Sequence, residues 1–405
     1  MARRIWIHVG TPKTGTSAFQ HALFTHHETL AASGITYPGD RFDAHFLAAL
    51  DLMDLPWGGL EREAVGAWQR LVSEVVAAPG DVILSHEIFG RASRLQVERA
   101  LADLGGGSDA VEIHVVLTGR DLARQLPAEW QENVKHRRTL TYASFLAAVT
   151  DPTRSREIAQ WFWGVQEIPD ILERWGGTLP PDRVHVVTLP PAGAAPALLS
   201  DRLAELFGLD RELLQPTGER ANASLGVAES ELVRRLNELV ELTLPNERYR
   251  QFVREALVHQ NLGVRRESPR LTVPADVHAW AIKVSDAWIA QLRDRGYDVV
   301  GDLDELRPTP QTEDFVDPEA ADPADLAKVA LKALAGSVAE SARLRDVEIE
   351  LHEIIDDLMG QLDDAHSTRI YKAKERLVAL SESNPIARAG LSGYRRLRGK
   401  SSRST

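Results

Sequence analysis

The stretch that decides the fold is Ile5-Trp6-Ile7-His8-Val9-Gly10-Thr11-Pro12-Lys13-Thr14-Gly15-Thr16-Ser17. It begins as an apolar strand, continues as a turn bounded by Gly10 and Gly15, and is followed at once by a helical pattern over residues 18–23. In such a unit the backbone N–H groups of the turn converge on an anion, and the helix N-terminus adds positive potential. The stretch therefore predicts a phosphate-binding loop at the start of an α/β fold.

The position of the lysine separates this loop from a nucleoside-triphosphate loop. A Walker A loop reads G-x-x-x-x-G-K-[ST], with the lysine directly after the second glycine. Gly10 and Gly15 have that spacing, but Thr16 stands at the lysine position. Lys13 lies two residues before Gly15 instead. A P-loop kinase or nucleoside triphosphatase is thus the enzymatic alternative, and the displaced lysine argues against it.

The segment from Pro12 to Ser17 resembles the loop of the sulfotransferase family that binds a 5′-phosphosulfate, which commonly reads P-K-[TS]-G-T-[TS]. The resemblance implies a bacterial sulfotransferase that uses 3′-phosphoadenylyl sulfate (PAPS) as co-substrate and needs no metal ion. It also implies that Lys13 neutralises the charge on the leaving phosphate. The loop residues expected to bind PAPS are Thr11, Lys13, Thr14, Gly15, Thr16 and Ser17.

A second phosphate site is expected after the apolar run of residues 111–117. Members of the family place an arginine just after this strand to bind the 3′-phosphate, and Arg120 matches it. They also place a serine eight residues later, where this chain has Ala128. Another donor must then complete the site. The candidates on the same predicted helix are Arg124, Gln131 and Lys135, of which we assign Lys135 to PAPS binding.

The base that accepts the proton of the acceptor hydroxyl is expected after a third apolar run, residues 82–85. His86 and Glu87 follow it, and the carboxyl ends of strands face the ligand crevice in open α/β sheets. Cytosolic sulfotransferases use a histidine here, whereas glycan- and tyrosine-modifying ones use a glutamate. Bacterial relatives often read Ser-x-Glu, which favours Glu87 over His86. The structural alternative is a polar pair that caps the next helix.

Short apolar runs alternate with helical patterns in the first half of the chain. The expected strands are Arg4–Val9, Val82–Ser85, Val111–Leu117 and Val184–Thr188, and the expected helices are Ser17–Thr25, Leu60–Ala77, Arg120–His136 and Arg154–Trp175. Continuous apolar strands alternating with helices are typical of a parallel sheet covered on both faces. We therefore predict an α/β protein with a P-loop-type parallel sheet flanked by helices, over residues 1–307.

The last quarter of the chain predicts a long-helix extension. Residues 308–325 are rich in proline and acidic residues and read as a linker, whereas 326–384 are nearly free of glycine and proline. Apolar residues recur there with 3,4 spacing, which is typical of coiled coils. The seam consists of Leu344, Val347, Leu351, Ile354 and Leu358. It predicts either a homodimer through this helix or a helix folded back on the main domain.

The end of the chain, residues 385–405, is basic. It contains Arg388, Arg395, Arg396, Arg398, Lys400 and Arg403 and no acidic residue. Such a segment is typical of a disordered, solvated tail. Its charge also suits peripheral contact with a membrane through anionic lipid headgroups.

The composition excludes several classes of protein. A formal net charge of −12 argues against general nucleic-acid binding. The chain has no cysteine, which excludes disulfides and thiolate metal sites, and its 13 histidines are scattered, so no metal site is expected. No run of about 18 apolar residues predicts a membrane span. The N-terminal residues lead directly into a strand without a signal peptide, and we expect a cytoplasmic protein.

These expectations describe an enzyme that transfers a sulfuryl group from PAPS to a hydroxyl of a carbohydrate, glycolipid or other small metabolite. No acceptor-binding motif is readable, although Trp57 in a Gly-rich loop is a candidate sugar contact. Residues 161–163 and Trp175 read as packing aromatics. The non-enzymatic alternative is a degenerate sulfotransferase-like protein that binds or assembles, which the alanine at Ala128 supports.

Overall fold

The computed structural model describes residues 3–215, 224–241, 243–263, 268–367, 369–383 and 386. The chain divides into two compact units, Met1–Ala333 and Leu334–Thr405. The predicted linker, residues 308–325, thus belongs to the first unit. Apart from Ile386, the predicted basic tail lies outside the described residues.

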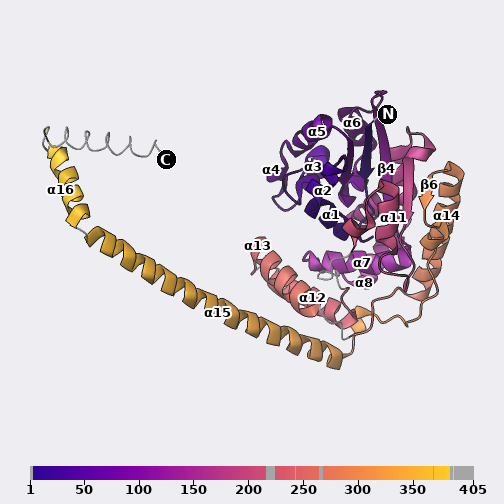
Figure 1. Cartoon of the computed structure of the whole chain (residues 1–405). Coiled ribbons are helices and arrows are strands. Elements are labelled where there is room, and N and C mark those ends of the chain that lie inside the picture. The colour runs from indigo at the N-terminus through magenta and orange to yellow at the C-terminus, as the bar shows by residue number, and fades with distance from the viewer. Residues whose placement is uncertain are drawn as a thin grey trace. The chain divides into compact units, whose positions relative to one another are not determined.

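A six-stranded parallel sheet forms the centre of the first unit (Figure 1). The strands are β1 (Arg3–His8), β2 (Ile35–Thr36), β3 (Asp81–Ser85), β4 (Val111–Gly119), β5 (Val184–Thr188) and β6 (Asp298–Val300). Their order in the sheet is β2-β3-β1-β4-β5-β6, and every pair is parallel. The predicted strands are confirmed as β1, β3, β4 and β5. The edge strands β2 and β6 are too short to carry a sequence pattern.

Strand β1 lies at the topological switch point of this sheet. After β1 the chain forms β2 and β3 on one side and then crosses to β4 on the other. Ligands of open α/β sheets bind at the carboxyl ends of the strands at such a point. His8 at the end of β1 is in register with Ser85 of β3 and Val116 of β4. The loop after β1 therefore lies at the same edge as the residues that follow β3 and β4.

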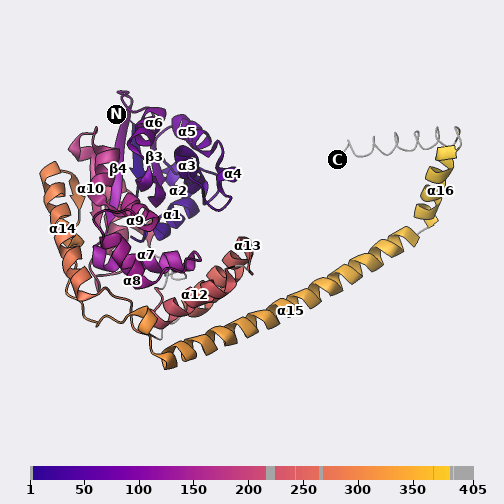
Figure 2. The ribbon, with the colours of Figure 1, turned by 180° about the vertical axis from the view of Figure 1, so that it is seen from behind.

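Helices cover both faces of the sheet (Figures 1 and 2). Ile5 and Ile7 of β1 belong to the larger core, whereas Trp6 belongs to a smaller core on the other face, because successive side chains of a strand point to opposite faces. The helices of the first unit that precede residue 210 are α1 (Thr16–Thr25), α2 (His27–Ala32), α3 (Ala44–Met53), α4 (Glu61–Ala64), α5 (Ala67–Ala77), η1 (Glu87–Arg91), α6 (Arg94–Asp103), α7 (Leu122–Lys135), α8 (Tyr142–Thr150), α9 (Glu157–Gln166), α10 (Ile168–Gly176), η2 (Pro181–Arg183) and α11 (Leu198–Phe207). The predicted α/β class is confirmed.

Two of the predicted helices are each divided in the structure. The pattern over 60–77 forms α4 and α5, because Gly66 between them has φ 75°, a left-handed conformation that favours glycine. The pattern over 154–175 forms α9 and α10. Pro169 in the first turn of α10 has no N–H to continue the preceding helix, but it fits a helix start.

The remainder of the first unit is mostly helical. Its elements are η3 (Arg211–Leu214), α12 (Val227–Val240), α13 (Asn246–Arg248), the π-helical segment η4 (Tyr249–Leu262), α14 (Ala275–Arg295), η5 (Leu303–Leu306) and η6 (Pro318–Ala320). Residues of the predicted linker contact this region: the side chain of Gln311 donates to the carbonyl of Val273 at 2.9 Å. Ala321, Val329 and Ala333 complete the larger core.

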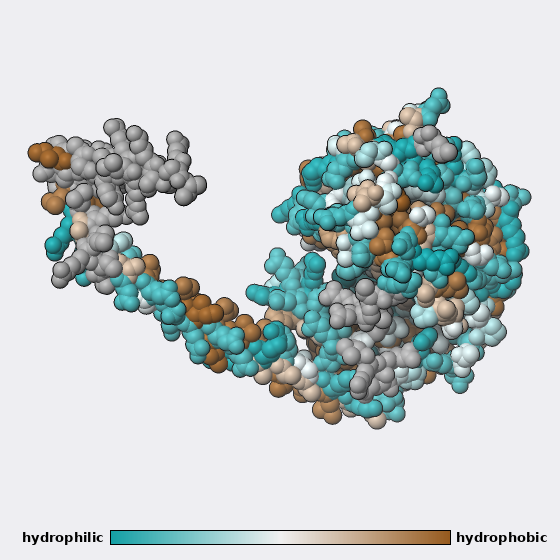
Figure 3. All heavy atoms as spheres, viewed as in Figure 1, coloured by the Kyte–Doolittle hydropathy of each residue, from teal (hydrophilic) through white to brown (hydrophobic). Residues whose placement is uncertain are grey.

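The second unit is helical in its described part. Helix α15 (Pro323–Ser367) begins in the first unit and continues into the second, where α16 (Arg369–Ser383) follows. The predicted long helix is confirmed. The seam from Leu344 to Leu358 is exposed, and apolar side chains gather along this helix (Figure 3). The homodimer through this seam stays a prediction. Among the described residues, no helix is long and apolar enough to cross a bilayer.

Two buried histidines connect the strands beneath the loop. The ring of His8 contacts the hydroxyl of Ser85 through Nδ1 (2.8 Å) and that of Thr118 through Nε2 (3.2 Å). His45 of α3 donates through Nε2 to the carbonyl of Pro38 and accepts through Nδ1 from the backbone N–H of Ser85. Burial lowers the pKa of both His8 and His45 to about 4.

The protein is therefore expected to lose stability as the pH falls from about 6.5 to 4. An unfolded histidine binds a proton near pH 6.5, whereas His8 and His45 stay neutral down to about pH 4, so the unfolded state binds more protons in this window. The loss is about 3 kcal/mol for each group. Urea unfolding at several pH values measures it. The free energy of unfolding is expected to depend less steeply on pH in His8→Gln, and as in the wild type in His27→Gln, which replaces an exposed histidine. Equal slopes in the wild type and both variants would contradict the role assigned to the buried histidine.

Candidate active site

The loop between β1 and α1 presents a row of free backbone donors. Among the described residues, none accepts a hydrogen bond from the backbone N–H groups of residues 13–17. Gly15 is the N-cap of α1, and no side chain caps the helix. The first N–H groups of a helix lack partners within the helix itself, so an anion is well placed to accept from them. The loop therefore has free backbone donors at the start of α1, and phosphate binding there stays a prediction.

Internal hydrogen bonds and close packing fix the shape of this loop. The buried hydroxyl of Thr14 contacts the carbonyl of Thr11 and the hydroxyl of Thr118 on β4, both at 2.6 Å. The backbone N–H of Thr11 donates to the carbonyl of Thr118 at 2.7 Å. A Cβ on Gly10, where φ is 121°, would come within 3.0 Å of the carbonyl oxygen of Glu87, so glycine is needed for this approach to β3. Thr16 is buried and Ser17 exposed.

Lys13 lies at the turn of the loop and points towards α7. Its backbone is left-handed, with φ 63°, a conformation that costs a non-glycine residue about 1–2 kcal/mol and is found mainly at functional sites. Its Nζ lies 2.5 Å from Oε2 of Glu132. The side chain of Lys13 is 28% exposed, so a ligand at the loop can reach it.

The carboxyl end of β3 brings His86 and Glu87 to the loop. His86 is the N-cap of η1: its Nδ1 accepts from the backbone N–H of Ile88 at 3.2 Å, the structural role that was the alternative for this residue. Glu87 accepts from the side-chain amide of Gln20 on α1 at 3.0 Å. Burial alone would raise the pKa of Glu87, yet the imidazole of His86 and the hydrogen bond from Gln20 hold it below its ordinary value. Glu87 is therefore an ionised carboxylate.

The carboxyl end of β4 supplies a second cationic region. Arg120 donates through Nη1 to the carbonyl of Lys13 at 3.2 Å, and its Nε is buried without a hydrogen-bond acceptor among the described residues. Burial, together with the charge of Arg124, lowers the pKa of Arg120 to about 10, and Arg270 adds a further positive charge nearby. Asp121 caps α7 through the N–H of Arg124. Arg120 is thus a partly buried cation with an unsatisfied donor, and not simply solvated.

The helix after β4 presents a polar face to the loop. Gln125 of this helix, α7, donates to the carbonyl of Pro12 at 2.5 Å, and Gln166 of α9 donates to the same carbonyl at 3.5 Å. Gln166 also donates at 2.9 Å to Oε1 of Glu129, which is 5% exposed. Burial raises the pKa of Glu129 to about 7, with Lys13 opposing this and the charges of Glu132 and Glu87 adding to it.

Glu129 and Glu132 were not identified from the sequence. Their only signal is spacing: with Gln125 they occupy positions i, i+4 and i+7 of a helix, which places them on one face. That face contacts the loop because α7 begins at the end of the neighbouring strand β4. The spacing alone does not say which element the face meets.

The predicted PAPS residue Lys135 lies beside Glu132 and not beside Arg120. Its Nζ lies 3.9 Å from the same Oε2 that binds Lys13. Of the other candidates on α7, Arg124 lies near Arg120, whereas Gln131 is buried and donates to the carbonyl of Leu225. The structure therefore places Lys135 beside the partner of Lys13, and Arg124 beside Arg120.

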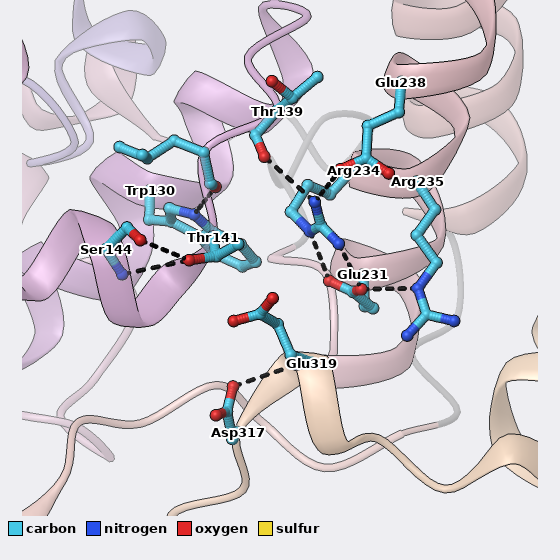
Figure 4. Close-up of polar contacts among 11 residues, drawn as sticks. Trp130, Thr139, Thr141, Ser144, Glu231, Arg234, Arg235, Glu238, Asp317 and Glu319 are labelled. Carbon is cyan, nitrogen blue, oxygen red and sulfur yellow. Dashed lines mark hydrogen bonds and ion pairs between the residues drawn. The ribbon is translucent and has the colours of Figure 1, made fainter.

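The C-terminal end of α7 is held in place by its neighbours (Figure 4). The indole of Trp130 donates to the carbonyl of Leu140 at 2.9 Å. Arg234 of α12 donates to the carbonyl of Thr139 at 3.1 Å and forms an ion pair with the fully buried Glu231 at 2.8 Å. These contacts fix the chain after α7 and hence the turn that carries Glu132 and Lys135.

Other features of the described structure lie apart from this site. A cavity of about 260 Å³ lies between α10 and α14, and its walls include none of the predicted site residues. Within the described part of the chain, no group of three or more histidine, aspartate or glutamate side chains is arranged to hold a metal ion. Phe162, Trp163 and Trp175 are buried packing aromatics as predicted, whereas Trp161, also predicted to pack, is only partly buried.

Comparisons with known proteins give one structural likeness. No protein-family model matches the chain, and no curated protein matches it in sequence. A sulfotransferase from Alicyclobacillus acidocaldarius, known from a crystal structure, aligns with a TM-score of 0.38 and 17% identity. The alignment covers 62% of this chain and 96% of that one. A likeness of this size does not assign an activity, which depends on the residues of the site.

Proposed function

We propose that this protein is a sulfotransferase that moves a sulfuryl group from PAPS to a hydroxyl group. The observation that carries the proposal is the loop of residues 11–17, which joins unpartnered backbone N–H groups to the ammonium group of Lys13. A phosphosulfate needs such an array of donors and a cation. The threonine at the Walker lysine position, Thr16, is buried and supplies no cation for a triphosphate.

The residues present fit the donor nucleotide. The backbone N–H groups of residues 13–17 would donate to the 5′-phosphosulfate, and Arg120 would bind the 3′-phosphate. The buried, unpartnered Nε of Arg120 supports the second assignment, because a buried donor without an acceptor is costly. Arg124 and Arg270, whose charges act on Arg120, are further cations for this second site.

The proposed reaction is a direct transfer between two oxygens. The acceptor oxygen forms a bond to sulfur while the bond from sulfur to the bridging oxygen breaks, and that electron pair stays on the 5′-phosphate. Glu87 takes the proton of the acceptor hydroxyl, since it is already ionised. Lys13 stabilises the charge that develops on the bridging oxygen.

The surroundings of His86 favour a carbohydrate as acceptor. The ring of Phe46 lies 5.0 Å from the imidazole of His86 and 5.5 Å from the ring of Trp57. Trp57 in turn lies 5.5 Å from Trp161, and both indoles are only partly buried. Arg91 covers the ring of Trp161 at 4.6 Å. Aromatic rings with polar partners are suitable surfaces for a sugar. The rings of Phe46, Trp57 and Trp161 form such a surface, which begins at His86, next to the proposed base Glu87.

The wild-type chain is expected to bind 3′-phosphoadenosine 5′-phosphate, the product nucleotide, in the presence of EDTA. Adenosine 5′-phosphate is expected to bind about tenfold or more weakly, because it lacks the 3′-phosphate that pairs with Arg120. Isothermal titration calorimetry measures both. A kinase or nucleoside triphosphatase would instead bind ATP with Mg²⁺. No heat of binding at high-micromolar 3′-phosphoadenosine 5′-phosphate would contradict the proposed function.

A further inference from the structure

The carboxylate of Glu132 is surrounded by basic side chains from three elements. Nζ of Lys13 lies 2.5 Å from Oε2, and Nη2 of Arg254 lies 3.7 Å from Oε1. Lys135 contributes its Nζ at 3.9 Å from Oε2, and His136 its Nε2 at 3.1 Å from Oε1. The loop, α7 and the π-helical segment η4 thus meet at one carboxylate.

This cluster holds more positive than negative charge. Lys13, Lys135 and Arg254 face Glu132, whereas the neighbouring Glu129, with a pKa of about 7, carries only part of a negative charge at neutral pH. The side chain of Lys135 is only 8% exposed, and burial lowers its pKa. The Nε of Arg254 is buried without an acceptor among the described residues.

Glu132 is the anion that the basic side chains of this cluster share. Burial would raise the pKa of Glu132, but the hydrogen bond from His136 and the charges of Lys13 and Lys135 hold it well below its usual range. The carboxylate is therefore ionised at neutral pH. It balances one of the three cations, and cations that remain unbalanced in a partly buried site favour the binding of a further anion.

We propose that Lys13, Lys135 and Arg254 form a receptor for the phosphosulfate end of the donor, in which Glu132 is the internal counter-ion that the donor displaces. The inference rests on the proposed function and adds to it Arg254 as a ligand-binding residue and Glu132 as a competitor. In the free protein Lys13 binds Glu132. When the phosphosulfate arrives, Lys13 exchanges one anion for another.

The counter-ion also makes the receptor selective by charge. A group with one negative charge would replace the contact between Lys13 and Glu132 with a contact of similar strength and so gain little. A phosphosulfate or diphosphate, which carries more charge over several oxygens, would engage Lys13, Lys135 and Arg254 together. The carboxylate thus disfavours small monoanions more than it disfavours the donor.

The test is calorimetry of the full chain with two probes, 3′-phosphoadenosine 5′-phosphate and inorganic pyrophosphate. Arg254→Gln is expected to weaken the binding of both about tenfold to a hundredfold, since it removes a charge-assisted contact. Arg254→Lys keeps the charge and is expected to lose less. Glu132→Gln is expected to strengthen binding about tenfold. Arg250→Gln, an exposed position of the same segment η4, is the matched control and is expected to bind like the wild type.

The outcomes separate this receptor from the proposed function. If the nucleotide binds the wild type but Arg254→Gln and Glu132→Gln both behave like Arg250→Gln, the receptor is refuted and the function stands. If pyrophosphate binding depends on Arg254 while the nucleotide does not bind, the receptor stands and the proposed function fails. If neither probe binds the wild type, both fail.

Discussion

Lys13→Ala is expected to lower the turnover of sulfuryl transfer about 100-fold to 1,000-fold. Lys13 is the cation of the loop, and removing one preorganised group that stabilises developing charge has an effect of this size. The substitution should also weaken nucleotide binding, because the 5′-phosphate loses an ionic contact. Turnover is measured as formation of 3′-phosphoadenosine 5′-phosphate from PAPS in the presence of a pool of extracted glycans and metabolites.

The loss should come from the site and not from unfolding. Glu132 keeps Lys135, His136 and Arg254 as partners when the lysine is removed, so the thermal unfolding midpoint is expected to change little. Lys283→Ala, an exposed lysine of α14, is the control and should retain full turnover. If Lys13→Ala also retains it, the role assigned to Lys13 is wrong.

The sequence was sufficient to predict the centre of the fold. An apolar strand, a loop between Gly10 and Gly15 and a helix form one local unit, whose geometry depends on neighbours in sequence. The positions of the residues after β3 and β4 were also predictable, since parallel strands place their carboxyl ends at one edge of the sheet. Glu87 and Arg120 thus lie at the edge where the pattern predicted them.

The sequence could not predict the charges that surround Lys13. Glu132 is 119 residues from its partner, and the contact depends on how α7 passes the loop. Arg254 comes from a π-helical segment, whose residues follow a different periodicity from an α-helix, so its direction is not readable from the pattern. Lys135 was one of three candidates for the 3′-phosphate, and in the structure it lies 3.9 Å from Glu132. Only packing decides which residue of one helix face meets which neighbour.

The second large effect is expected at Glu87, where replacement by glutamine should lower kcat about 100-fold to 10,000-fold. A positioned base contributes a factor of this size, and glutamine keeps the shape and the contact with Gln20 but accepts no proton. His86→Asn is the matched control. Its ring nitrogen Nδ1 already accepts from Ile88, so its loss should affect the start of η1 more than proton transfer.

The pH dependence identifies the base independently of these variants. The pKa of Glu87 lies below its ordinary 4.5, so Glu87 stays ionised from pH 8 down to pH 5, and the rate should fall through its protonation only below about 4.5. Glu129, with a pKa of about 7, would instead make the rate fall as the pH decreases through 7, because a base must be ionised to accept a proton. A profile of kcat that is level from pH 8 to 5 therefore supports Glu87. A decrease centred near pH 7 that Glu129→Gln abolishes would assign the proton transfer to Glu129, because Glu87 does not change its protonation near pH 7.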